Sequence, residues 1–180
     1  MKAKALLIAN VILFLLATLL LAAGQTSLWL QIFGYFPPPA LWIPGLVYIA
    51  LFRSTMTVVI VSHLIAIALA TSTVMPEGLM MISCLAVALS VQVFKTRFYW
   101  TATTYFMLVC GLSTIVFHLY HYAASWVVGD HPLTAPQLTA WTIQALLTPL
   151  FAPILFPVFR WFDQITNRTE PPEITGAYSA

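Results

Sequence analysis

Long runs of apolar residues, separated by short polar or proline-rich stretches, dominate the pattern along this chain. Six runs can be distinguished, at residues 5–24, 40–52, 55–73, 78–94, 101–128 and 141–162. They are continuous rather than alternating, and most approach the length of about 20 residues that crosses a bilayer as a helix. The pattern therefore predicts an all-α, polytopic membrane protein with six transmembrane helices.

Composition supports a membrane protein and excludes a nucleic-acid partner. Of the 180 residues, 61% are hydrophobic and 7% are charged, whereas a soluble domain carries about a quarter charged residues. The net charge is +2, and no basic stripe exists that could neutralise a series of phosphates. The lipid bilayer is thus the expected surrounding, and Cys84 and Cys110 are expected to be small buried residues within their apolar runs.

The second run is the least certain span. Its 13 residues would form a helix of about 20 Å, which is short for a bilayer crossing. The crossing needs either a thinner bilayer or a preceding segment, SLWLQIFGYFPPP, that dips into the membrane.

The basic residues predict the orientation, because Lys and Arg are retained on the cytoplasmic side of short loops. With six spans and the N-terminus inside, all seven basic residues fall on the cytoplasmic side. These residues are Lys2, Lys4, Arg53, Lys95, Arg97, Arg160 and Arg168. We therefore expect both termini inside, a transmembrane domain over residues 1–165, and a disordered cytoplasmic tail over residues 166–180.

Few residues could carry chemistry, since no Asp, Glu, Lys or Arg is predicted in the middle of a span. His63 lies ten residues after Arg53, about 15 Å along the third helix and hence near the midplane. It could bind a substrate or relay protons. The favoured interpretation is a neutral imidazole hydrogen-bonded to a polar side chain on a neighbouring helix.

His118 and His121 have the spacing that puts two imidazoles on one face of a helix. A metal site needs a third or fourth ligand, and only Asp130 and His131 in the following loop could be added. Interfacial anchoring is favoured over metal binding or an enzyme that uses these histidines. No catalytic, cofactor or metal site is predicted.

Three prolines recur every four residues in the last helix, at Pro149, Pro153 and Pro157. Each proline lacks the N–H that would bond the carbonyl four residues earlier, which frees the carbonyls of Ala145, Pro149 and Pro153. Such a stripe cannot face hydrocarbon, so protein, water, or side chains such as those of Gln144 and Thr148 must cover it. It is either a kinked helix packed in its own bundle or part of a docking groove.

Two segments give the chain a resemblance to a known family. FPPPALWIPGLVYIALFRS enters the second helix, and LLTPLFAPILFPVFRWFDQI forms the last helix before a short polar tail. With six short-looped helices and all basic residues inside, the chain resembles the rod shape-determining MreD family. That family is similar in fold to the substrate-binding S-components of vitamin transporters. The third run departs from the family, because VVIVSHLIAIALATS has His63 where MreD-like chains often have a glycine-rich stretch ending in Asp.

The resemblance implies a non-enzymatic scaffold in the bacterial inner membrane. It would belong to the elongation complex that organises peptidoglycan synthesis, with an MreC-like partner and, through it, MreB, RodA and a transpeptidase. The alternative is an S-component-like subunit of a small-molecule transporter, with His63, Gln144 and Thr148 lining a pocket open to the outer face.

Overall fold

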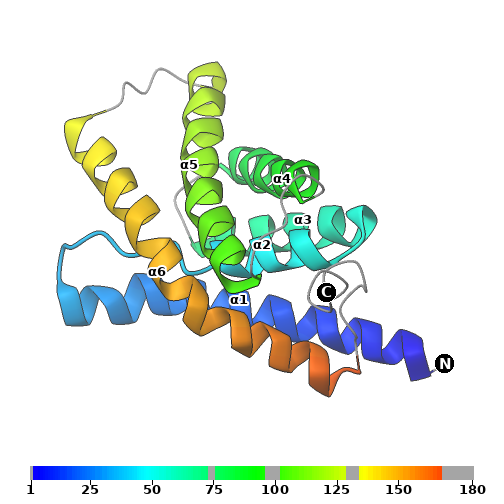
Figure 1. Ribbon diagram of the computed structural model, residues 1–180. Coiled ribbons are helices and arrows are strands. Elements are labelled where there is room, and N and C mark those ends of the chain that lie inside the picture. Colours follow the sequence, from blue (N-terminus) through cyan, green and yellow to red (C-terminus); the bar gives the residue numbers. More distant parts are fainter. Residues whose placement is uncertain (1, 73–75, 96–101, 129–133, 168–180) are drawn as a thin grey trace.

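The computed structural model describes residues 2–72, 76–95, 102–128 and 134–167. Within these ranges the chain forms six α-helices and no β-strand (Figure 1). The helices are α1 (Lys2–Phe33), α2 (Ile43–Phe52), α3 (Thr55–Ser72), α4 (Glu77–Phe94), α5 (Ala102–Val128) and α6 (Ala135–Ile165). The prediction of an all-α chain whose six apolar runs are helical is confirmed.

Four of these helices are long and apolar enough to cross a membrane: α1, α4, α5 and α6. The apolar helices α2 and α3 are shorter. These properties are those of a multi-pass membrane protein. Figure 1 shows α1 lying across the lower part of the view, α5 standing upright and α6 slanting between them. The helices therefore do not run parallel to one another, and the six-span count with both termini inside stays a prediction.

The short helix α2 is the centre of the fold. It packs against all five other helices, and every one of its residues is buried. Its 10 residues extend about 15 Å, roughly half the thickness of a bilayer core. Because protein surrounds it on all sides, α2 does not need the length of a lipid-facing span.

The proline-rich segment before α2 folds back along α1. Gly34, with a positive φ of 60°, allows the chain to turn after Phe33. The side chain of Gln25 then accepts a hydrogen bond from the backbone N–H of Leu41, at 3.1 Å. Gln25 lies eight residues before the end of α1, so the segment has returned about 12 Å along that helix. Figure 1 shows this return toward the centre of the molecule.

Prolines suit this extended segment, since they carry no N–H that would need a partner within the membrane. Pro37, Pro38 and Pro39 occupy three successive positions of it. The N–H of Ala40, which follows them, donates to Thr148 Oγ1 of α6 at 3.0 Å. The segment is thereby attached to α6 as well as to α1.

Aromatic rings fill the space between α1, α2 and α6. Tyr48 of α2 stacks on Phe14 of α1, with ring centroids 5.3 Å apart, and it lies 5.3 Å from the ring of Phe159 of α6. All three side chains are at most 1% exposed. Large buried rings contribute more apolar contact than any other side chains, so this cluster is a main source of packing energy.

The backbones of α1 and α2 approach each other closely at Gly45. A Cβ atom at this position would collide with Thr18 Oγ1 of α1. Small residues at such points let helices in membranes come together. Gly45 therefore allows α2 to reach its central position beside α1.

Candidate functional site: a buried polar network

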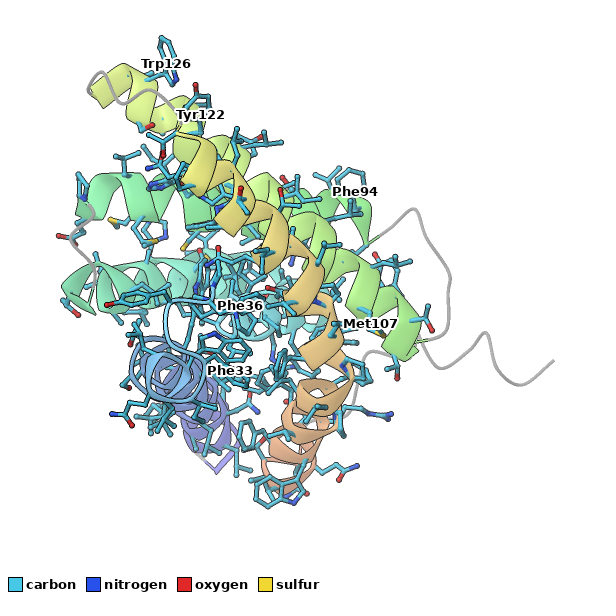
Figure 2. The ribbon with its side chains drawn as sticks, turned by 90° about the vertical axis from the view of Figure 1, so that its left-hand side faces the viewer. Phe33, Phe36, Phe94, Met107, Tyr122 and Trp126 are labelled. Carbon is cyan, nitrogen blue, oxygen red and sulfur yellow. The ribbon has the colours of Figure 1, made fainter. Side chains whose placement is uncertain are left out.

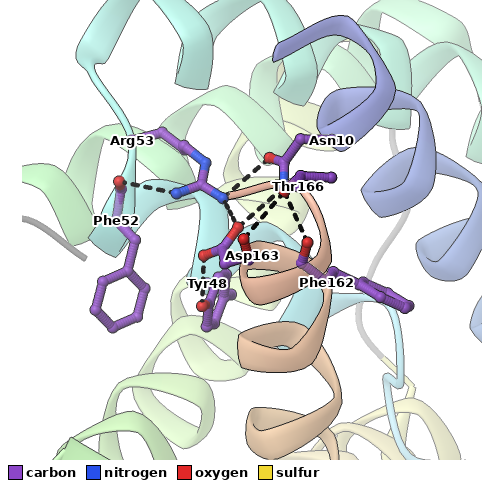
Figure 3. A network of polar contacts seen from close by, with 7 residues as sticks. All are labelled: Asn10, Tyr48, Phe52, Arg53, Phe162, Asp163 and Thr166. Carbon is purple, nitrogen blue, oxygen red and sulfur yellow. Dashed lines mark hydrogen bonds and ion pairs between the residues drawn. The ribbon is translucent and has the colours of Figure 1, made fainter. Parts of the chain in front are cut away.

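A network of buried polar side chains joins α1, α2 and α6 (Figure 3). At its centre Arg53 Nη2 forms an ion pair with Asp163 Oδ1. The two side chains are 6% and 5% exposed. The network is completed by Asn10, Tyr48 and Thr166, which are buried as well.

The local structure explains how these groups meet. Arg53 is the C-cap of α2, so its side chain leaves the end of the helix toward α1 and α6. Asp163 is in the last turn of α6, and Thr166 is the C-cap of that helix. Asn10 comes from the first half of α1, and Tyr48 lies one turn before the end of α2.

Both oxygens of the Asp163 carboxylate are occupied. Oδ1 accepts from Arg53 and, at 3.0 Å, from Asn10 Nδ2, whereas Oδ2 accepts from the Tyr48 hydroxyl at 2.8 Å. A buried carboxylate is tolerated only when it is paired and hydrogen-bonded, and Asp163 meets both conditions.

Arg53 and Asn10 are also well supplied with partners. Arg53 Nη2 donates to Asn10 Oδ1 at 3.0 Å, and Nη1 donates to the Phe52 carbonyl at 3.3 Å. Asn10 Nδ2 donates to Thr166 Oγ1 at 2.8 Å. The guanidinium also lies 5.5 Å from the centroid of the Phe14 ring, a cation–π distance.

This arrangement holds helices together and offers no free acid or base. A general acid or base needs an accessible proton site within reach of a substrate. Here the charged atoms bond to one another and lie under protein. The contacts of the network are those of a structural connection between three helices.

The sequence pattern does not predict this network. It places Arg53 with the other basic residues on the expected cytoplasmic side, and it gives Asn10, Tyr48, Asp163 and Thr166 no role. Thr166 was placed at the start of the tail, yet it lies in the network, while residues 168–180 lie outside the described residues. One signal in the sequence could have suggested the ion pair. The six-span scheme puts Arg53 and Asp163 at helix ends on the same side of the membrane.

His63 of α3 differs from the expected interpretation. Its side chain is half-buried, and Nδ1 lies 2.7 Å from the carbonyl oxygen of Val59, in its own helix. The contact shown for this ring is thus to a carbonyl one turn back in α3 rather than to a polar side chain of a neighbouring helix. In the described part of the chain α3 and α6 do not pack together, so His63 is not brought beside Gln144 and Thr148.

Thr148, near the middle of α6, makes hydrogen bonds within the protein. Its side chain is fully buried, accepts from Ala40 N–H and donates to the Gln144 carbonyl at 2.7 Å. The Gln144 side chain is half-buried and lies beside His118 of α5. Thr148 therefore attaches the proline-rich segment to α6, while Gln144 faces α5.

The three prolines do not interrupt α6, which is helical from Ala135 to Ile165. Pro149 and Pro153 are half-buried, and Pro157 is exposed. A Cβ built on Gly111 of α5 would lie 3.5 Å from Pro149 Cγ and 3.7 Å from the Ala145 carbonyl oxygen. That part of the stripe therefore faces α5.

His118 lies at the contact of α5 with α6, and His121 follows it about one turn later in α5. The His118 ring stacks on Trp141, with centroids 4.9 Å apart, and the His121 ring stacks on Phe117 at 5.8 Å. Buried nitrogens of both, His118 Nε2 and His121 Nδ1, have no hydrogen-bond partner among the described residues. No group of three or more possible metal ligands occurs there either, and Asp130 and His131 lie outside those residues.

Comparison with known proteins adds no assignment. No protein-family model, no curated protein and no solved structure matches this chain.

Proposed function

We propose that this chain is a non-enzymatic scaffold subunit in a bacterial inner membrane, belonging to the complex that organises peptidoglycan synthesis during elongation. The observation that carries the proposal is that Arg53 and Asp163 are buried and bonded to each other. Both charged groups are used to join helices. An enzyme or proton-coupled carrier would keep such a group available for its substrate.

The resemblance to the MreD family supports the same proposal. Its two distinctive segments, residues 36–53 and 146–164, are far apart in the sequence but meet in the structure. α2 packs against α6, Ala40 bonds to Thr148, and Arg53 pairs with Asp163. The residues that carry the resemblance thus form one structural unit, which would present the scaffold's surface to an MreC-like partner and, through it, to MreB, RodA and a transpeptidase.

Depletion of the protein in its host tests the proposal. We expect rod-shaped cells to become round as the protein is lost, while uptake of vitamins and other small nutrients stays normal. Normal cell shape with loss of uptake of one nutrient would contradict the scaffold and support the S-component-like alternative. Re-expression of the wild-type chain is the control that links either phenotype to this protein.

A further inference from the structure

One face of α3 is exposed, while the rest of the helix is packed. In the described part of the chain α3 contacts α1, α2 and α4, and Figure 2 shows it between α4 above and α1 below. The exposed face carries Met56 (71% exposed), Ile60 (51%) and Ile67 (40%), and His63 lies in the same line, half-buried. These residues follow one another at spacings of four, three and four, the pattern of a seam along which two helices pack.

The hydrogen bond of His63 determines which of its ring nitrogens stays free. Nδ1 lies 2.7 Å from the Val59 carbonyl oxygen, which can only accept, so Nδ1 carries the hydrogen. In the neutral ring Nε2 then has a lone pair and no hydrogen. Among the described residues Nε2 has no hydrogen-bond partner, and protein does not enclose it, unlike the partnerless nitrogens of His118 and His121. The exposed face of α3 therefore presents a free acceptor.

The predicted depth of His63 excludes lipid as the source of a donor. The 18 residues of α3 extend about 27 Å, close to the thickness of about 30 Å of a bilayer core. His63 is the ninth of these residues, so it lies near the midplane of the predicted span. Acyl chains carry no hydrogen-bond donor there, and an acceptor without a partner in hydrocarbon costs free energy. A donor on a second helix would remove this cost.

The kind of helix follows from the same acceptor. Two copies of this chain that met through α3 about a twofold axis would place one lone pair opposite the other. The backbone N–H groups of a transmembrane helix are already bonded within that helix, so the donor must be a side chain. We propose that the exposed face of α3 docks a transmembrane helix of a different protein, whose hydroxyl or carboxamide side chain donates a hydrogen bond to His63 Nε2. This inference goes beyond the proposed function, because it does not depend on which membrane complex the chain belongs to.

The test is photocross-linking in the host membrane, with Ile60 of the full chain replaced by a photoreactive amino acid. We expect one other polypeptide to be cross-linked, and mass spectrometry should place the cross-linked residue in a transmembrane helix, within one turn of a Ser, Thr, Asn or Gln. His63→Phe keeps a ring but removes the acceptor, and it should lower the yield about three- to tenfold, the range of one hydrogen bond between helices in a membrane. His63→Gln keeps an acceptor and should retain more of the yield.

Thr71→Val is the matched control, because it removes an exposed hydroxyl from the same helix and should leave the yield unchanged. Replacing the partner's donor residue by Ala should lower the yield as much as His63→Phe does, with no further loss when the two are combined. Cross-links confined to lipid or to a second copy of this chain would overturn the proposal, as would an unchanged yield from a His63→Phe chain present at wild-type levels. A cross-linked partner whose own depletion leaves cells rod-shaped would support this docking face while counting against the proposed scaffold function.

Discussion

Arg53 and Asp163 are separated by 110 positions in the sequence and form a buried ion pair that joins the end of α2 to the last turn of α6. Around this pair, Asn10 adds α1 to the same contact. These three side chains thus connect the first, second and last helices of the chain. We therefore expect the stability of the contact between these helices to depend on both charged groups.

The first prediction concerns that dependence. Asp163→Ala leaves the Arg53 guanidinium buried and unpaired, and we expect a loss of about 3–5 kcal/mol in the free energy of unfolding. Arg53→Ala should cost a similar amount, because the carboxylate is then uncompensated. The measurement is chemical unfolding in detergent, with exposed Gln164→Ala as the control, for which a change within about 0.5 kcal/mol is expected. Wild-type stability of both single variants would refute the structural role of the pair.

The second prediction concerns the close approach of α1 and α2. Gly45→Ala introduces a Cβ that collides with Thr18 Oγ1, and we expect a destabilisation of about 1–3 kcal/mol. Adding Thr18→Ala removes the obstructing hydroxyl and should restore part of the loss. Gly111→Ala is the matched control, because its Cβ would meet Pro149 at an ordinary contact distance of 3.5 Å. Equal effects of the two glycine substitutions in thermal unfolding would argue against this packing.

The third prediction concerns the attachment of the proline-rich segment. Thr148→Val keeps the shape of the side chain but leaves the Ala40 N–H without its acceptor, which should cost about 1–3 kcal/mol. Thr148→Ser retains the hydroxyl and should cost less. Thr142→Val, at an exposed position of α6, is the control. Hydrogen exchange at the Ala40 amide provides a local readout, and an unchanged exchange rate in Thr148→Val would count against the contact.

Much of this architecture could be predicted from the hydrophobic pattern alone, while the end of the first helix and the start of the last could not. The third, fourth and fifth helices begin and end within a residue of their predicted positions. The first helix continues to Phe33 instead of ending near Gly24. Residues of low helix propensity such as Gly24 and Ser27 are tolerated inside a helix when packing against other parts of the protein outweighs that propensity. The last helix begins at Ala135, where Thr134 and Gln137 form a capping box that an apolar pattern does not reveal.

The buried polar network could not be predicted from the pattern of apolar and charged residues, for a physical reason. Charge distribution predicts on which side of the membrane Arg53 lies, but it carries no information on which helix becomes its lateral neighbour. Asn10 is a polar residue within an apolar run, a signal that could have suggested a buried contact. Its partners, Arg53 and Asp163, could be identified only once α1, α2 and α6 were placed together.

The fourth prediction concerns the prolines of α6. Replacing Pro149, Pro153 and Pro157 by Ala restores three backbone hydrogen bonds and removes the free carbonyls, so the helix should straighten. If the stripe contributes to a docking groove, capture of partner proteins in a pull-down should fall while the variant remains folded. Pro136→Ala, at the start of the same helix, is the control. A triple variant that retains every partner would exclude a docking role for these prolines.

The measurement that tests the central claim most directly is cell shape in a host depleted of the native protein and supplied with Arg53→Gln/Asp163→Asn. This double variant removes both charges but keeps hydrogen-bonding groups at both positions, so a purely structural pair should tolerate it better than either single alanine variant. The scaffold account predicts rod-shaped cells with normal nutrient uptake. Round cells that contain the folded double variant at wild-type levels would contradict it, because the charges would then be needed for something other than joining helices.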